Sequence, residues 1–592
     1  MKPLIAPAAA AALTAQIPSR LVKKLDADPA MADRWTWTQD GAAWLVRTDK
    51  TEVVRLDAVD GVVRDAAAVT CTCLLQPRCL HVAAVIAGLA PADVAVPAPI
   101  AAAGTAPVLG RPGAVSSVPT SGPAAGPDGS TTATAAAEHA FRVVADVLAT
   151  GGQASGAFAQ AELLRAIHSC RTVGLHRLAA AQTRILRSIR ELRADVPEFS
   201  LGVLTADLRD ALAVAWAIGH AGDHAPALYG TARRDYEPAG NLRLRGVFTE
   251  AVVARSGYAG AVTYMIDDRG AIYTRADVAA GDATRAAGAY DAPAGIGDAV
   301  LPHRELCRSG LFVSDATASA DGRLGAGQRV RAVRASEPSR WDHALLDARW
   351  KAPLAQQLAQ LATHDASPDE LRPAGWDLVF LEGVIVGLTS GGVAFHAGDS
   401  PVALVTVHDH RALPARDNLV VLGRATGLRV RVIGRARLGA PRRVELLAIG
   451  PAADETRLAF PDAWHGRANL HYDRLSVPAL AGGGVVGLQP AEPPEDLLAP
   501  LRRRVERVVH GGLGTLPTHA MPEIDREAAG LAERALRGGG DLLRELATIA
   551  HDAGRAMTGE RRAVDRRAFA RAWVRAALYE DAARRRLSVA SW

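Results

Sequence analysis

The stretch CTCLLQPRCLH, which runs from Cys71 to His81, gathers three cysteines and one histidine into eleven residues. Its pattern is Cys-x-Cys, five intervening residues, and then Cys-x-His. Zinc in structural sites takes four ligands in a tetrahedron, and thiolate and imidazole are its preferred donors. The pattern therefore predicts one structural Zn²⁺ ion, with no open position for water or substrate, bound by Cys71, Cys73, Cys79 and His81.

The residues on either side of this motif predict a small unit built as a β-hairpin, a knuckle and a helix. The segments AWLVRT and TEVVRLD, joined near Asp49 and Lys50, have the apolar pattern of two paired strands. A Cys-x-Cys pair at the end of a strand can direct both sulfurs toward one point if the chain bends there. Pro77, in the segment between the ligand pairs, favours a tight turn. The segment HVAAVIAGLA predicts a short helix, so the last two ligands enter as this helix begins.

The alternative interpretation is that three buried thiols and a core histidine lie together by chance. Only five cysteines occur in 592 residues, and the other two, Cys170 and Cys307, stand alone. This distribution is typical of a reducing compartment with one metal site and not of a disulfide framework. Small zinc sites bind with apparent free energies of about 10–16 kcal/mol, so the ion would decide whether a unit of this size folds.

The motif, preceded by Trp-containing strands and followed by an apolar helix, resembles the SWIM zinc finger over residues 40–90. The resemblance implies the same four ligands. The spacer is at the short end for that family, and Leu80 stands where a Lys or Pro is common. Further along the chain, RSGYAGAVTY and SADGRLGAGQRVRAV are similar to segments of bacterial SWIM-finger proteins of about this size.

This resemblance implies DNA binding or protein–protein interaction as the task of the finger, and it implies no reaction. Proteins of this kind are often encoded beside MoxR-type AAA+ ATPases and von Willebrand A-domain proteins. The resemblance therefore implies a protein partner, with such an ATPase as one candidate.

Changes in composition divide the chain, which is too long for one ordinary core. The segment at 91–135 has almost no charged or aromatic residues, so the burial of its side chains cannot offset the entropy lost on ordering it. We expect this segment to be a linker that tethers the zinc unit loosely. We predict an α+β multidomain protein with a zinc finger domain at 1–90, an Ala/Pro/Gly/Ser-rich linker at 91–135, a helical domain at 136–235, a mixed α+β region at 236–365, a β-rich region at 366–490 and a helical C-terminal region at 491–592.

Within the later regions, AGAVTYMI and AIYTRADV flank the turn Asp267–Gly270 and predict a hairpin. We expect one helix around 343–363. Closely spaced strands then favour a small barrel, for which an OB-like barrel is one form. The strands are predicted from WDLVFLEGVIVGL, PVALVTV, NLVVLG, LRVRVIGRARL and RVELLAIG. In the C-terminal region, Gly538-Gly539-Gly540 is expected to break two helices.

The charge of the chain does not demand a polyanionic partner, because the net charge is +5 and the basic residues are nearly all arginine. Two arginine-rich stretches are nevertheless candidates for phosphate binding. Each pattern is also typical of the solvated side of an amphipathic helix. The first stretch is Arg184, Arg187, Arg190 and Arg193; the second, interleaved with Trp573 and Tyr579, is Arg561, Arg562, Arg566, Arg567, Arg571 and Arg575.

No local pattern predicts catalysis. The segment HGGLG near Gly511 lacks the Lys-Ser/Thr of a phosphate-binding loop, and the sequence contains no G-x-S-x-G and no H-E-x-x-H. Two further pairings could bind metal, but neither has additional ligands nearby in the sequence. These are His303 with Cys307, and His408-Asp409-His410.

Three hypotheses of function follow. The first is a non-catalytic accessory protein whose zinc-stapled module recognises a partner. The second is a DNA- or RNA-binding protein that uses the finger together with the arginine-rich faces. The third is an enzyme with a dispersed site, which a buried cluster of carboxylates or histidines would favour. The N-terminal segment lacks the Leu-rich centre of a signal peptide, and no stretch approaches the ~20 apolar residues of a membrane span, so we expect a cytoplasmic protein.

Overall fold

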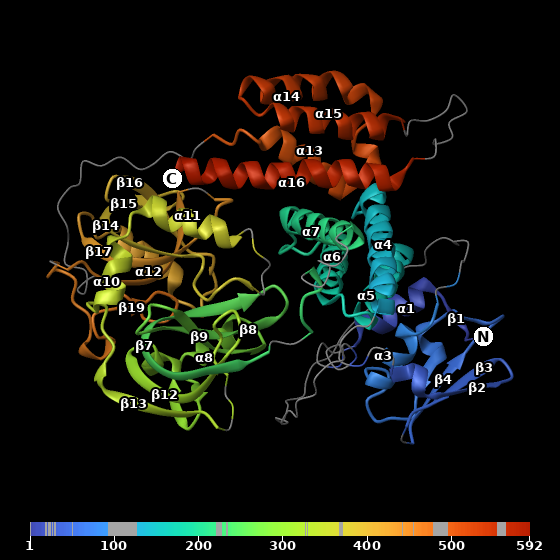
Figure 1. Cartoon of the computed structure of the whole chain (residues 1–592), viewed down its shortest axis with the longest axis horizontal. Helices are drawn as coiled ribbons and strands as arrows, with labels where there is room; N and C mark the ends of the chain where they lie inside the picture. Colours follow the sequence, from blue (N-terminus) through green and yellow to red (C-terminus); the bar gives the residue numbers. More distant parts are fainter. Residues whose placement is uncertain are drawn as a thin grey trace. The chain divides into compact units, whose positions relative to one another are not determined.

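The computed structural model of the chain is drawn in Figure 1. It describes residues 2–17, 21, 25, 28, 31–49, 51–90, 92, 127–220, 228–232, 235–325, 327, 329–365, 367, 371–440, 442–453, 455–476, 495–552 and 564–592. The fold is α+β with several sheets and a helical C-terminus, as predicted. Contacts divide the chain into two compact units, Met1–Ala232 with Ala499–Glu580 and Arg233–Leu498 with Asp581–Trp592.

The N-terminal part of the first unit is a small sheet with short helices packed on it. Its core side chains alternate along the strands, as at Val54 and Leu56, which are fully buried on either side of the exposed Arg55. The antiparallel sheet has the order β2 (Thr36–Asp40), β3 (Ala43–Arg47), β4 (Val53–Asp57) and β6 (Val69–Cys71). Pairing of β3 with β4 confirms the predicted hairpin.

Short elements complete this part of the chain. The strand β1 (Leu4–Ile5) pairs in parallel with β5 (Val62–Val63). The helix predicted after the cysteine motif is α3 (Leu80–Ala87), whose buried residues join the same hydrophobic core. The remaining elements are α1 (Pro7–Ala15) and two 3₁₀ turns at Met31–Arg34 and Ala66–Ala68.

Helices make up the rest of the first unit. They are α4 (Pro127–Thr150), α5 (Ala157–Thr172), α6 (His176–Arg193), α7 (Leu201–His220), α13 (Ala499–Gly511), α14 (Met521–Glu533), α15 (Arg537–Asp552) and the part of α16 (Arg566–Ser591) that ends at Glu580. Of the predicted linker, residues 91 and 93–126 lie outside the described residues, and its last part, from Pro127, belongs to α4. Both α1 and α3 contact α5.

The three consecutive glycines do not separate two helices, as the sequence predicted, but lie in the first turn of α15. The chain turns earlier, where α14 is capped at Arg534 and Ala535 has a φ of 61°. The glycines permit close packing, since a Cβ on Gly539 would lie 2.8 Å from the Tyr579 ring and one on Gly540 would lie 2.6 Å from the Ala528 carbonyl oxygen.

The second unit begins with a five-stranded antiparallel sheet. Its order is β13 (Arg331–Pro338), β12 (Ser309–Ala318), β7 (Glu237–Ala254), β8 (Tyr258–Asp267) and β9 (Ile272–Ala280). Pairing of β8 with β9 confirms the hairpin predicted around Asp267–Gly270. The pairing of β12 with β7 reaches only to Arg245, so the later half of β7 has one edge without a strand partner in the described part of the chain.

Between β9 and β12 lie α8 (Ala283–Ala289), the hairpin β10 (Pro293–Ile296) with β11 (Ala299–Pro302), and α9 (His303–Leu306).

The second sheet of this unit has six strands, in the order β16 (Ser400–Val405), β15 (Gly392–Ala397), β14 (Leu378–Thr389), β17 (Arg429–Ala436), β18 (Arg443–Pro451) and β19 (Ala468–Asn469). A parallel pairing of β16 with β18 closes five of these strands into a ring. This closing pairing joins only Ala403–Val405 to Arg443–Glu445, so the ring is not a clear barrel, and the OB-like barrel stays a prediction.

Two predicted elements of this region are wrong. The helix expected at 343–363 is two helices, α10 (Ala344–Lys351) and α11 (Leu354–Asp365), because Ala352 precedes a proline and takes an extended conformation. The segment NLVVLG is not a strand but part of the helix α12 (Ala415–Gly423). Short apolar runs are ambiguous between a strand and a buried helix, and here a helical spacing of buried residues at 415, 418, 419, 422 and 423 determined the outcome.

None of the helices in the described part of the chain has the length and apolar character that crossing a bilayer requires.

Candidate metal centre

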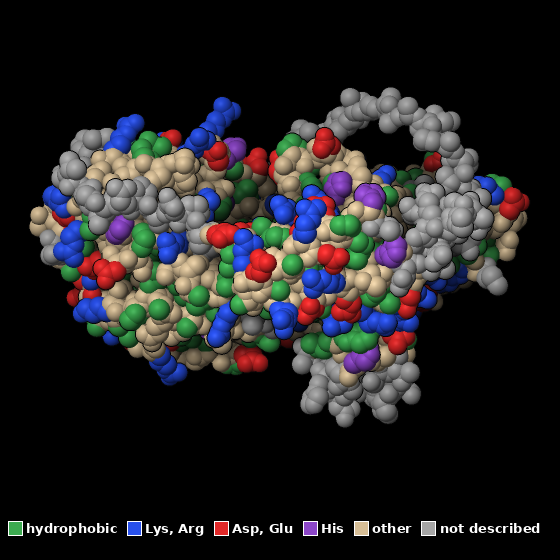
Figure 2. All heavy atoms as spheres, turned by 90° about the horizontal axis from the view of Figure 1, so that it is seen from above, with side chains coloured by type: hydrophobic (Ala, Val, Ile, Leu, Met, Phe, Trp, Pro, Cys, Tyr) green, Lys and Arg blue, Asp and Glu red, His purple; other side chains and the backbone are tan. Residues whose placement is uncertain are grey.

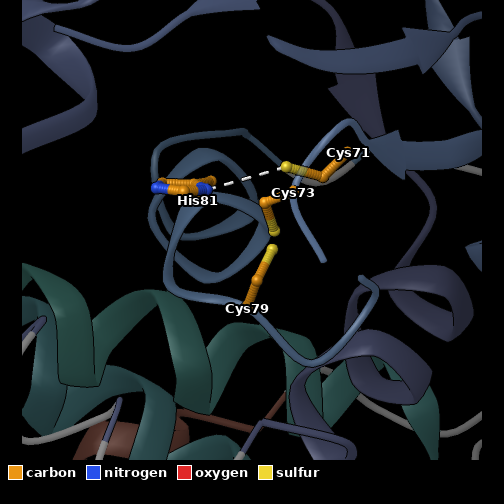
Figure 3. A group of neighbouring side chains, drawn as sticks. All are labelled: Cys71, Cys73, Cys79 and His81. Atoms are coloured by element: carbon orange, nitrogen blue, oxygen red, sulfur yellow. Dashed lines mark hydrogen bonds between the residues drawn. The ribbon is translucent and has the colours of Figure 1, made fainter. Parts of the chain in front are cut away.

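The four side chains that the sequence singles out come from the end of a strand, the loop after it and the start of a helix (Figure 3). Cys71 is the last residue of β6, and Cys73 lies in the loop that follows. Cys79 caps the N-terminus of α3, and His81 lies in the first turn of that helix. The strand end and the helix start that the sequence predicted therefore supply the four side chains.

The donor atoms of these residues all lie within 4.8 Å of one another. The Sγ of Cys71 is 3.7 Å from the Nδ1 of His81, and the Cys73 and Cys79 sulfurs point toward each other (Figure 3). A thiolate and an imidazole nitrogen that share a tetrahedral zinc ion are about 3.6 Å apart, given the usual zinc–ligand distances. The cluster can therefore hold a metal ion with little rearrangement.

Local hydrogen bonds position the ligand residues. The side-chain oxygen of Gln76 accepts the backbone N–H of Cys71 at 2.6 Å, which ties the loop back to the strand. The backbone N–H of Val82 donates to the Sγ of Cys79 at 3.4 Å, as a helix cap does. The indole of Trp35 packs edge-on against the His81 ring, with 6.0 Å between the ring centres. Three neighbouring side chains or backbone groups therefore restrict the ligands.

The electrostatics of the site also suit a cation. Burial raises the pKa of the Cys71 thiol to about 12 and raises the pKa of Cys79, because a thiolate without a counterion is poorly solvated there. A divalent cation supplies the missing charge and deprotonates a coordinating thiol outright. Three thiols and one imidazole are the donor set of structural zinc sites, so these residues fit the zinc ion that the sequence predicts.

The other candidate ligands of the sequence do not form the sites considered for them. The Nδ1 of His303 is hydrogen-bonded to the hydroxyl of Thr263 at 2.7 Å, and the Cys307 thiol donates to the Arg304 carbonyl at 3.4 Å. Asp409 pairs with Arg416 at 2.6 Å. In the part of the chain that the structure describes, none of these residues belongs to a group of three or more potential ligands.

His408 does join such a group, but its companions are Glu445 and His471, which the sequence analysis missed. No local signal could have found them, because they lie 37 and 63 residues further along the chain, on other elements. Only the pairing of β16 with β18 and of β18 with β19 brings these segments together.

Several of the arginines that were candidates for phosphate contacts are paired within the protein. On α6, Arg184 binds Asp207 at 2.6 Å and Arg193 donates to the carbonyl of Gln153 at 2.7 Å. On α16, Arg566 binds Asp146 at 2.8 Å. Arg561 and Arg562 lie outside the described residues. Figure 2 shows positive and negative side chains interspersed over much of the face that it presents.

Comparison with protein-family models, with the curated proteins and with the solved structures finds no match for this chain.

Proposed function

We propose that this chain is a cytoplasmic, non-catalytic accessory protein that recognises a protein partner through a zinc-stapled finger of the SWIM type. The four converging ligands support the zinc ion, and the motif spacing supports the SWIM type. A MoxR-type AAA+ ATPase is the candidate partner, on the strength of the resemblance alone.

The observation that carries a recognition role is the exposure of two leucines in the loop between the ligands. Leu74 is 104% and Leu75 57% exposed, and both lie between Cys73 and Cys79. Burying a leucine gains about 1.5–3 kcal/mol, so burial of these two leucines against a partner would favour docking of the loop. Because the ligands and Gln76 restrict this loop, docking it against a protein would lose little conformational entropy.

The charge of the module supports a protein partner over a nucleic acid. Residues 31–90 contain seven acidic and six basic side chains. Three thiolates would add one negative charge in excess of a zinc ion. Nucleic-acid binding draws most of its affinity from neutralised phosphates, which needs a cluster of cations that this module lacks.

The test measures binding of a purified MoxR-type AAA+ ATPase to the zinc-loaded full chain. Leu74→Asp combined with Leu75→Asp should weaken binding by at least ~10-fold, as for the loss of an interface hot spot. Val59→Asp is the matched control, because Val59 is 59% exposed in the same module and belongs to the turn between β4 and β5, not to the ligand loop. Equal binding by the double variant and wild type would contradict the proposal.

A second measurement addresses nucleic acid directly. Labelled duplex and single-stranded DNA are titrated with the zinc-loaded protein at two salt concentrations. We expect no binding at low salt. Tight binding that falls steeply with salt would instead favour the DNA- or RNA-binding hypothesis.

A further inference from the structure

A pocket of about 500 Å³ in the second unit is lined by residues from both of its sheets. Four segments contribute to its wall: the turn between β8 and β9 with the start of β9, the end of β12 with the loop after it, the helices α10 and α11, and the residues that lead into β14. Sites for small molecules occupy about 300–1,000 Å³, so the pocket is large enough for an organic ligand.

The segments that line the pocket are packed closely against one another. Gly322 has a φ of 79° and Gly375 a φ of 69°, both in the left-handed region. A Cβ on Gly322 would lie 2.8 Å from the Ile272 carbonyl oxygen, and one on Gly375 would lie 2.8 Å from the Ile272 side chain. The backbone N–H of Thr274 also donates to the Gly322 carbonyl at 2.9 Å. A ligand would therefore enter a largely preformed site.

Arg349 is the only lysine or arginine among the described residues of the pocket wall, and no aspartate or glutamate lines that wall. Its Nη2 donates to the Gly270 carbonyl at 2.6 Å, and its guanidinium lies over the Phe380 ring, 5.4 Å from the ring centre. Burial lowers the pKa of the Arg349 guanidinium, and no carboxylate in the described part of the chain raises it. The pocket therefore holds one positive charge without an opposite charge beside it.

The neighbouring arginine of β17 shows the usual arrangement. Arg431 binds Asp347 and Glu382, each at 2.7 Å, so its positive charge is balanced within the protein. A charge that is partly removed from water is unfavourable unless it is paired. Because Arg349 has no such partner among the described residues, an anion from outside the chain would compensate its charge.

The bond to Gly270 leaves one two-pronged side of the Arg349 guanidinium unused. Nη2 has two hydrogens, one beside the Nε hydrogen and one beside an Nη1 hydrogen. Whichever of them the Gly270 carbonyl accepts, the other forms a parallel pair with its neighbour. A carboxylate accepts such a pair through its two oxygens, and its single negative charge matches the single guanidinium.

The rest of the wall suits the body of an organic molecule. Tyr273 and Trp376 provide aromatic surface, and small and aliphatic side chains surround them. The side chains of Gln360 and His364, both on α11, also line the pocket and form no hydrogen bond with the described residues. These two groups are available to orient polar atoms of a ligand.

We propose that this pocket binds a small organic acid, whose carboxylate pairs with Arg349 and whose aromatic body lies against Tyr273 and Trp376. The guanidinium supplies the charge and the two-pronged geometry, and the aromatic side chains supply the apolar contact. The site takes a ligand and implies no reaction.

The first test measures binding of phenylacetate and of its neutral amide, phenylacetamide, to the full-length protein by ligand-observed NMR at millimolar concentration. Phenylacetate should bind, and the amide should bind at least ~10-fold more weakly, because hydrogen bonds between two charged groups are the stronger ones. Inorganic phosphate at the same concentration should not displace the acid. Absence of acid binding, equal binding of acid and amide, or displacement by phosphate would overturn the proposal.

The second test assigns the carboxylate to one residue. Arg349→Gln should weaken phenylacetate binding by at least ~10-fold, and Arg349→Lys should recover part of the loss, since lysine restores the charge but not the two-pronged geometry. Arg269→Gln is the matched control, because Arg269 is exposed one residue before Gly270 and does not line the pocket. Equal binding by Arg349→Gln and wild type would refute the site. The comparison of acid with amide needs no variant, so it decides the question even if Arg349→Gln folds poorly.

The zinc finger provides an independent comparison, because the pocket belongs to the second unit and the cysteine motif to the first. Cys73→Ser should keep phenylacetate binding unchanged. Phenylacetate should also raise the unfolding temperature of the second unit, since it binds only the folded pocket. Loss of acid binding in Cys73→Ser would contradict a site built from the second unit alone.

Discussion

Cys73 shows why loss of one ligand of the cysteine motif should have a larger effect than loss of one ordinary side-chain contact. It lies in the loop after β6, is half-buried against the core of the module, and is grouped with the other three donors. The sheet and α3 meet at these residues, so the binding free energy of an ion held there would contribute directly to folding of the module. A change at one ligand should therefore affect the whole module.

We expect Cys73→Ser to abolish zinc binding and to unfold the N-terminal module, while the helices of the rest of the first unit persist. The measurement is zinc per chain together with amide hydrogen exchange. Cys170→Ser is the matched control, because Cys170 is a buried cysteine on α5 that is not part of the cluster, and it should keep one zinc ion. Retention of zinc by Cys73→Ser would contradict the assignment.

Glu250 is a buried residue whose charge should contribute to the acid stability of the second unit. Burial alone would raise its pKa, but the charge and hydrogen bonds of Arg435, with a hydrogen bond from Tyr264, lower it below 4.5. The group therefore stabilises the fold above its unfolded pKa, and this contribution disappears as the pH falls through the folded value. Denaturant unfolding at neutral and acid pH should show a loss of stability in the wild type that is much smaller in Glu250→Gln.

At the scale of elements, glycines in α14 and α15 differ in how much space there is at the position that a Cβ would take. Gly539 faces the ring of Tyr579 on α16. Gly530 is inside α14, and no atom lies within 4 Å of the position that a Cβ would take there, so this glycine only weakens the helix.

We therefore expect opposite effects of the same substitution. Gly539→Ala should destabilise the first unit by about 1–3 kcal/mol through overpacking, and Gly530→Ala should stabilise it by up to about 1 kcal/mol. Urea unfolding followed by circular dichroism measures both. A stabilising Gly539→Ala would mean that α16 does not pack on α15 in this way.

At the scale of the whole molecule, the compact units do not follow the order of the chain. Residues 499–580 belong to the same unit as residues 1–232. Trp573 is fully buried in this unit and donates its indole N–H to the Val505 carbonyl at 3.0 Å. The C-terminal helices should therefore contribute to the stability of the first unit.

Trp573→Ala should lower the free energy of unfolding of the first unit by about 3–5 kcal/mol, because it leaves a large cavity. Leu578→Ala on the same helix should cost much less, since Leu578 is 43% exposed. Calorimetry should show that the transition of the second unit is unchanged. A shift of both transitions by Trp573→Ala would contradict separate units.

The sequence by itself determined the α+β class, the hairpins at 43–57 and 258–280 and the set of four candidate ligands at Cys71–His81. These features are local: ligand spacing and apolar alternation act between residues that are near in sequence. Tertiary structure decided what depends on distant residues. It made NLVVLG a helix, because the burial of one face outweighs the ambiguous pattern of a short apolar run. It also paired the C-terminal helices with the N-terminal half and brought His408, Glu445 and His471 together, since strand pairing and not spacing places these residues side by side.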